Sequence, residues 1–258
     1  LIIHGGMPLL KNLTKAVSQA GLEIDQLVMT SLAASTAVLT KRQKELGVVL
    51  VDMGAGTTSI AVYEENNLLH TAVIPLGGMH ITNDIAIGLR CSVDTAEKAK
   101  MHYGHAMSRS VGVHEEIDLS TVDPEEQERV SRVEMVEIIE ARLEEIFDYV
   151  TRELKKINRD GKLPAGIVLT GGGAELPGLV EFVKYHLHLP TQVGHAQDIQ
   201  TVIDQVDQPS FATAVGVVLW GSRFASPPQG NSMLGSFSRI FQNEALMKLK
   251  KMFKSFLP

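Results

Sequence analysis

A short turn rich in glycine and threonine is the first part of the sequence whose residues could bind a charged ligand. It runs over Asp52–Ser59 and follows an apolar, β-branched segment, Gly47–Asp52. Glycines allow a tight reversal that brings backbone N–H groups close to phosphate oxygens, and hydroxyls can donate further hydrogen bonds. Asp52 ends the strand, where a carboxylate can hold Mg²⁺ through water. The alternative is an ordinary hairpin turn that happens to contain glycine. The candidate phosphate contacts are Gly54, Gly56, Thr57 and Thr58.

A second glycine-rich turn favours the ligand-binding interpretation. It follows another buried strand segment, Gly166–Thr170, and leads into a helix after Leu179. Without side chains, the backbone of such a turn lets the sugar or base of a nucleotide pass close by. The residues concerned are Gly171, Gly172, Gly173 and Ala174. Two such turns, each at the end of a buried strand, predict a nucleotide site.

The elements that must position these turns follow from the apolar pattern. Spacings of three and four predict a helix over Pro8–Gly21, and small residues favour another over Leu32–Leu39. Continuous apolar residues predict that the strand Gly47–Asp52 is covered on both faces. Further strands are predicted at Leu1–Ile3, Ile24–Thr30, Ser59–Tyr63, Leu69–Pro75 and Gly166–Thr170.

A helical block separates the two groups of strands. His80–Leu89 and Thr95–Tyr103 have helical patterns, and Val111–Leu119 could be extended. Pro124–Ile157 is long, charged and periodic, with one apolar stripe that predicts a buried helix face. The stripe consists of Val133, Val136, Ile139, Leu143, Ile146, Phe147, Val150 and Leu154. The order predicts an α/β layer with a helical block inserted between its two halves.

Composition narrows the class of protein. The chain has 44% hydrophobic and 21% charged residues, the ordinary balance of a globular protein. A net charge of -6 argues against a general nucleic-acid binder. Cys91 is the single cysteine, so no internal disulfide can form and a reducing cytoplasm is expected. The chain starts at Leu1 in a segment typical of the middle of a domain, so we expect an N-terminal part to precede it.

The order of strands, turns and helical block resembles the second half of the actin and chaperone ATPase superfamily. Within it, the sequence is similar to the bacterial FtsA cell-division family from near Asn12 to the C-terminus. The resemblance implies an α/β, actin-like ATPase fold: a ribonuclease H-like second domain with an inserted helical lobe, and an N-terminal domain largely missing. The stretches that carry it are Gly21–Leu27, Glu45–Val48 leading to Asp52, His70–Pro75, Ala165–Gly172 and Thr213–Gly216.

The resemblance also implies a division into domains. Residues 1–46 would be a remnant of the N-terminal domain, and residues 47–77 and 166–221 the second nucleotide-binding core domain. Residues 78–165 would form the inserted partner-binding lobe. Residues 222–242 are rich in Ser, Pro and Gly and predict a flexible linker, which leads to a terminal helix over residues 243–258.

By the same resemblance, ATP and Mg²⁺ are the expected cofactors. The turn from Asp52 would be the second phosphate loop, and Gly171–Ala174 the adenosine turn. Glu97 and Lys100 match the helix that faces the ribose and adenine, although the bare sequence also fits an exposed helical pair. Met29–Ser31 occupies the place where active relatives position the attacking water, so we expect ATP binding with weak or no hydrolysis.

The C-terminal segment is amphipathic. On a helical wheel, apolar residues of Asn243–Leu257 gather on one face and lysines on the other, with Met247 misplaced. About 15 residues are too few to span a bilayer, but this pattern suits the surface of an anionic membrane. The alternatives are a helix docked on the protein's own core and a calmodulin-like target helix. The residues expected at the membrane include Leu246, Lys248, Leu249, Lys251, Met252, Phe253 and Phe256.

The family resemblance further implies partners. The inserted lobe would bind the C-terminal peptide of the tubulin-like protein FtsZ, and the protein would self-associate into filaments at the cytoplasmic face of the membrane, at the division site. Arg142 is the candidate peptide contact, within a helix motif where Ala141 replaces the usual proline. The alternative for Arg142 is an ion pair with Glu145.

Two other classes of protein share the fold and the loops. A pilus-assembly platform protein of the PilM type would not be expected to need the lysine-rich tail. A small-molecule kinase of the same superfamily would need a carboxylate base in the N-terminal domain. The tail favours the membrane-bound cell-division protein.

Overall fold

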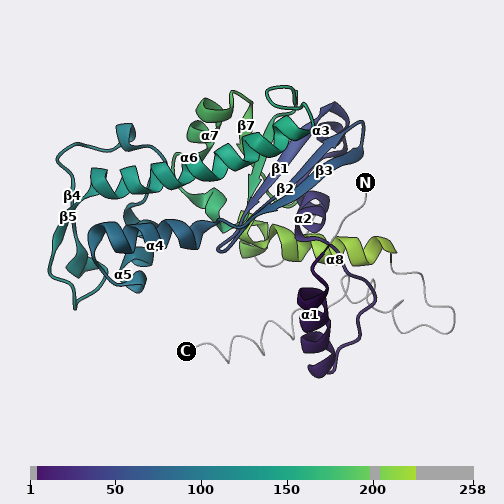
Figure 1. Ribbon diagram of the computed structural model, residues 1–258, viewed down its shortest axis with the longest axis horizontal. Coiled ribbons are helices and arrows are strands. Elements are labelled where there is room, and N and C mark those ends of the chain that lie inside the picture. Colours follow the sequence, from purple (N-terminus) through teal and green to yellow (C-terminus); the bar gives the residue numbers. More distant parts are fainter. Residues whose placement is uncertain (1–4, 198–203, 225–258) are drawn as a thin grey trace. The chain divides into compact units, whose positions relative to one another are not determined.

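The computed structural model describes residues 5–197 and 204–224. It contains groups of helices and strands along the chain, as expected of an α/β protein (Figure 1). The helices are α1 (Met7–Gln19), α2 (Thr30–Val38), α3 (Lys41–Leu46), α4 (Gly78–Leu89), α5 (Val93–Tyr103), α6 (Arg132–Lys156), α7 (Leu179–Leu187) and α8 (Ala212–Phe224). The strands are β1 (Val48–Met53), β2 (Thr58–Glu64), β3 (Asn67–Ile74), β4 (Glu116–Asp118), β5 (Arg129–Ser131), β6 (Ile167–Thr170) and β7 (Thr191–Val193).

The central sheet joins the two halves of the sequence. Its strand order is β3-β2-β1-β6-β7, so β6 pairs directly with β1 although more than 100 residues separate them. The β1–β2 and β2–β3 pairs are antiparallel, whereas β6 runs parallel to β1 and β7 parallel to β6. This topology confirms the prediction that the helical block is inserted between two parts of one α/β layer.

Both faces of the sheet are covered, as the apolar sequence of β1 predicts. Val49 and Val51 pack into one hydrophobic cluster, together with residues of α6 and α7. Val48 and Leu50, whose side chains point to the opposite face, pack into a second cluster with residues of α2 and α8. All four side chains are fully buried, which makes the sheet a rigid base for the turns at the ends of β1 and β6.

The inserted block consists of α4, α5 and the small β4–β5 sheet, joined to the N-terminal part of α6 (Figure 1). α4 packs against both α5 and α6. The predicted apolar stripe of α6 is confirmed, because its residues from Val136 to Leu154 are buried. Val133 is only partly buried, and Met135 joins the core in addition.

Three predicted elements differ from the structure. Residues 24–29 form no strand, since Ile24 and Leu27 are exposed and no described strand pairs with them. Of Val111–Leu119, only Glu116–Asp118 is a strand. The long helix begins at Arg132 rather than Pro124, because Arg129–Ser131 pairs with β4 and the Ser131 hydroxyl then caps the helix by accepting from the N–H of Glu134.

The chain divides into two units, Leu1–Trp220 and Gly221–Pro258, and only the last residues of α8 are described in the second. The predicted boundary at residue 46 falls inside the first unit, where Ala34 and Val38 of α2 pack on the sheet. The predicted linker begins with helical residues, since α8 reaches Phe224. The strand at Leu1–Ile3, the rest of the linker and the terminal helix lie outside the described residues. No helix in the described ranges has the length and apolar character needed to cross a membrane.

Candidate functional site

The two glycine-rich turns lie side by side because β1 and β6 are parallel neighbours. Asp52 is opposite Thr170 in the register, so both strands end at the same edge of the sheet. Gly171 has a φ of +80°, which side chains rarely adopt, and a Cβ there would lie 2.5 Å from Asp52 Oδ1 and 2.6 Å from the carbonyl oxygen of Met53. Only glycine at position 171 lets the turns approach this closely.

The first turn also contacts the start of α4. The N–H of Gly78 donates to the carbonyl of Gly54 (2.9 Å), and the N–H of Met79 donates to that of Ala55 (2.8 Å). At Gly77, a Cβ would lie 2.5 Å from the Gly54 oxygen and 2.6 Å from the Ala55 oxygen. The turn is therefore linked to the first helix of the inserted block by two hydrogen bonds and a contact that needs glycine.

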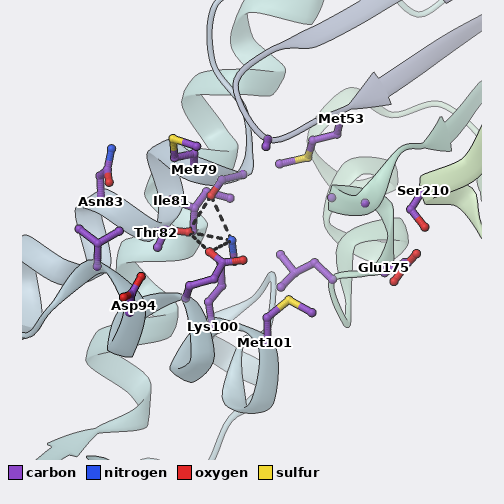
Figure 2. Close-up of a pocket in the computed structure, with 18 of the residues that line it drawn as sticks. Met53, Met79, Ile81, Thr82, Asn83, Asp94, Lys100, Met101, Glu175 and Ser210 are labelled. Atoms are coloured by element: carbon purple, nitrogen blue, oxygen red, sulfur yellow. Dashed lines mark hydrogen bonds and ion pairs between the residues drawn. The ribbon is translucent and has the colours of Figure 1, made fainter. Parts of the chain in front are cut away.

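A cavity of 770 Å³ opens between the two turns and the helices α4 and α5. In Figure 2, Thr82 and Lys100 approach it from one side, and Met53, Glu175 and Ser210 from the other. Its lining combines glycine backbone with apolar side chains and a few polar groups, as is usual for small-molecule sites of this size. The apolar lining includes Met53, Met79, Ile81, Met101, Leu176 and Pro177.

Three polar residues of the lining, Thr82, Glu97 and Lys100, form one cluster. Lys100 Nζ donates to Glu97 Oε2 (2.7 Å), to Thr82 Oγ1 (2.8 Å) and to the Gly78 carbonyl (3.2 Å), and the Thr82 hydroxyl also donates to Glu97 Oε2. Burial alone would raise the pKa of Glu97, but the bonds from Lys100 and Thr82 and the charge of Lys100 hold it below its ordinary value. Glu97 is therefore a carboxylate at neutral pH.

Asp52 lies beside the cavity rather than in its lining. Its Oδ2 accepts a hydrogen bond from the Thr213 hydroxyl (3.0 Å) on α8. Burial raises the pKa of Asp52, and the bond from Thr213 offsets part of that rise. The carboxylate is therefore next to both turns without being part of the cavity lining.

The predicted site residues fall into two groups. Gly54, Gly172, Gly173, Glu97 and Lys100 line the cavity. Asp52, Gly56, Thr57, Thr58, Gly171 and Ala174 support the turns without lining it. For Thr58 the structure corrects the expected donor role: the residue is fully buried, and its hydroxyl donates to the carbonyl of Leu76 (2.8 Å).

Several lining residues were not predicted. Thr82 is the most important, because its hydroxyl connects α4 with the Glu97–Lys100 pair on α5. Met79, Met101 and Leu176 were missed as well. A polar residue within the apolar pattern of α4 is the one signal that could have indicated Thr82, whereas the apolar lining looks like ordinary core in the sequence.

Arg142 lies outside this cavity, at the junction of α6 with α4. Its guanidinium donates to both oxygens of Asp84 (2.5 and 2.9 Å) and also pairs with Glu145. The ion pair with Glu145, which was the alternative to the peptide contact, is present, and the bidentate pair with Asp84 was not predicted. The bond from Arg142 to Asp84 raises the pKa of the guanidinium further.

The arrangement suits a ligand with an anionic part and a flat apolar part. Backbone of the two turns lies along one part of the lining, and methionine, leucine and proline side chains along another. A Cβ at Gly172 would meet no atom within 4 Å, so the turn leaves open space for a ligand. Among the described residues, no group of three or more His, Cys, Asp or Glu could hold a metal ion by itself.

Known proteins of similar structure share this fold. MreB5 of Spiroplasma citri bound to ADP matches with a TM-score of 0.64 at 20% identity, over 85% of this chain and 67% of that one. A PilM–PilN type IV pilus biogenesis complex matches with a TM-score of 0.61 at 20% identity, over 84% of this chain and 58% of that one. At these identities the matches show the actin-like fold alone.

Comparisons of sequence identify the family. The family model for the cell division protein FtsA matches residues 49–216. FtsA of Pseudomonas aeruginosa is 38% identical over 226 residues, which cover 88% of this chain and 54% of that protein. FtsA of Neisseria meningitidis is 41% identical over 218 residues, covering 84% and 53%. The chain thus spans about half the length of these relatives, and it belongs to the FtsA family of actin-like cell-division proteins.

Proposed function

We propose that this chain supplies one side of an ATP site in a cell-division protein. The observation that carries the proposal is the cavity between the two glycine turns and α4–α5. MreB5, which has the same fold, has been solved bound to ADP and to AMPPNP. The size of the cavity, its glycine backbone and its apolar lining suit a nucleoside phosphate.

Different residues of the cavity would contact the phosphates, the sugar and the base of the nucleotide. The phosphates lie along the backbone at Gly54 and at Gly172 and Gly173, where no side chain blocks their approach. The sugar faces Glu97 and Lys100, and the base packs against the apolar lining. Mg²⁺, held through water near Asp52, would neutralise part of the phosphate charge.

The test fills the cavity without disturbing the fold. Gly172→Leu places a side chain in open space at a backbone conformation that other residues adopt, so the protein should fold while losing ATP affinity by roughly a hundredfold or more. Calorimetric titration of the intact protein with ATP and Mg²⁺ measures the loss. Gly221→Leu, also in open space but outside the cavity, is the matched control. Equal affinity in both variants, or no ATP binding by the wild type, would refute the site.

Family membership supports a wider role. In this role, the protein binds ATP with weak or no hydrolysis and forms filaments. It also tethers FtsZ filaments to the cytoplasmic face of the membrane at the division site. Arg142 is the proposed contact for the C-terminal peptide of FtsZ, and residues 243–258 the proposed contact with anionic lipid. The PilM-type alternative is supported by the fold alone, whereas the FtsA relatives are more than a third identical in sequence.

A further inference from the structure

The polar cluster of the cavity is more constrained than a surface ion pair. Thr82 is 2% exposed, and the side chain of Lys100 is 13% exposed, whereas that of Glu97 is 49% exposed. The buried Thr82 and the partly buried Lys100 therefore hold Glu97, whose side chain still reaches solvent. Figure 2 shows the contacts of Thr82 and Lys100 as dashed lines.

Lys100 has no N–H left for a ligand in this arrangement. An ammonium group has three N–H donors, and Lys100 directs them to Glu97, Thr82 and the Gly78 carbonyl. A direct contact between Lys100 and a nucleotide would require one of these bonds to break. In this arrangement, Lys100 instead fixes the position of the Glu97 carboxylate.

Thr82 directs its single hydroxyl hydrogen in the same way. Because the Thr82 oxygen accepts from Lys100, its hydrogen points away from the ammonium, toward Glu97 or the Gly78 carbonyl. The bond to the Glu97 carboxylate is charge-assisted, so it is the stronger of the two. Within the described chain, Glu97 Oε2 thus accepts two bonds and Oε1 accepts none.

We propose that Thr82 is the positioning residue for the sugar side of the ATP site, an inference that rests on the proposed function. By fixing Oε2, Thr82 and Lys100 present Oε1 of Glu97 to a ribose hydroxyl. The site then selects ribonucleoside over deoxyribonucleoside phosphates, because a deoxy sugar has no hydroxyl to donate to Oε1 of Glu97.

The competing explanation is that Thr82 only packs α4 against α5. Two substitutions separate the explanations. Thr82→Val keeps the shape and removes the hydroxyl, whereas Thr82→Ser keeps the hydroxyl and removes a methyl group. A packing role makes serine the worse substitution, and a positioning role makes valine worse.

The measurement is the ratio of affinities of the intact protein for ATP and for its 2′-deoxy and 3′-deoxy analogues. We expect the wild type and Thr82→Ser to favour ATP over at least one analogue by roughly tenfold, as a charge-assisted hydrogen bond would give. In Thr82→Val the preference should fall to about threefold or less, while affinity for the deoxy analogue changes little.

The matched control is Thr95→Val, which removes a fully buried hydroxyl on α5 that donates to Asp123 (2.8 Å) outside the cavity. It should lower the melting temperature without changing the ratio. An unchanged ratio in Thr82→Val, an equal loss in Thr82→Ser, or the same loss in Thr95→Val would overturn the positioning role. A wild type that binds no ATP would instead refute the site itself.

Discussion

At the scale of single residues, the proposed role of Asp52 in binding Mg²⁺ conflicts with its burial. The proposed Mg²⁺ site needs a charged carboxylate, but burial beneath Gly171 disfavours the charge and raises the pKa. A folded-state pKa above the ordinary 3.8 means that Asp52 contributes stability below pH 3.8 and loses it as the pH rises through the folded-state value. At neutral pH the residue therefore costs stability.

Asp52→Asn should consequently make the protein more stable and less able to bind. We expect a melting temperature at pH 7 higher by roughly 2 °C or more, with the gain shrinking as the pH falls toward 4. Affinity for ATP with Mg²⁺ should fall by roughly tenfold or more. Thermal unfolding against pH, together with calorimetric titration, measures both effects.

Thr213→Val provides the opposite case. It removes the donor that stabilises the Asp52 carboxylate, so the melting temperature at pH 7 should fall rather than rise. If Asp52→Asn lowered the stability at pH 7, the claim that the buried Asp52 carboxylate costs stability would be wrong.

Arg142 poses a second question at this scale, because its guanidinium already has two carboxylate partners. Charge reversal would place a third carboxylate beside Asp84 and Glu145 and confuse lost binding with lost structure. Arg142→Gln and Asp84→Asn are the better pair. Both weaken the α4–α6 junction, but only the first removes the cation.

If Arg142 contacts the FtsZ peptide, Arg142→Gln should weaken peptide binding by roughly tenfold, while Asp84→Asn, which leaves the guanidinium with Glu145 as its ionic partner, should keep or improve it. Fluorescence anisotropy with a labelled C-terminal peptide of FtsZ measures the affinities. Equal peptide affinities of the two variants would show that Arg142 only joins α4 to α6 and does not contact the peptide.

At the scale of elements, the link between the first turn and α4 joins the proposed ATP site to the inserted block. Gly77 is the critical position, since a Cβ there would lie within 2.8 Å of three backbone atoms of the turn. Gly77→Ala should push the turn and the helix apart, lower stability by about 1–3 kcal/mol and weaken ATP binding. Unfolding in denaturant and ATP titration measure the two losses.

The neighbouring glycine is the matched control. A Cβ at Gly78 would meet its nearest atoms at 3.8 Å, an ordinary contact, so Gly78→Ala should retain both stability and binding. Equal losses of stability and ATP binding in the two variants would show that glycine is needed here for its backbone flexibility rather than for close contact.

The elements also show how far the sequence alone could lead. The strands that precede the two turns are apolar up to Asp52 and Thr170, so the turns and the insertion between them could be predicted from local pattern. The Asp84–Arg142 pair joins residues 58 apart in the sequence, and Thr82 meets Lys100 only when α4 packs against α5. Residues 24–29 look like a strand, but a strand also needs a neighbour to pair with.

At the scale of the whole molecule, the proposed function requires the ATP site and the membrane contact to act in one assembly. A single amphipathic helix binds membranes weakly and reversibly. Filament formation would bring many such helices to one surface, and the avidity would then exceed the affinity of any one helix. Membrane binding should therefore depend on the tail and increase with self-association.

The last prediction concerns the charge of that tail, residues 243–258. Each lysine near an anionic surface adds about 1 kcal/mol of attraction, so the double substitution Lys248→Glu and Lys251→Glu should weaken binding to phosphatidylserine-containing vesicles by roughly a hundredfold or more. The control pair Lys11→Glu and Lys15→Glu makes the same charge change at exposed positions of α1 and should bind like the wild type. Vesicle sedimentation of the intact protein measures both, with neutral phosphatidylcholine vesicles in parallel. Wild-type binding that is equally strong on neutral vesicles, or equal losses in the two pairs, would show that the lysine face does not select the membrane.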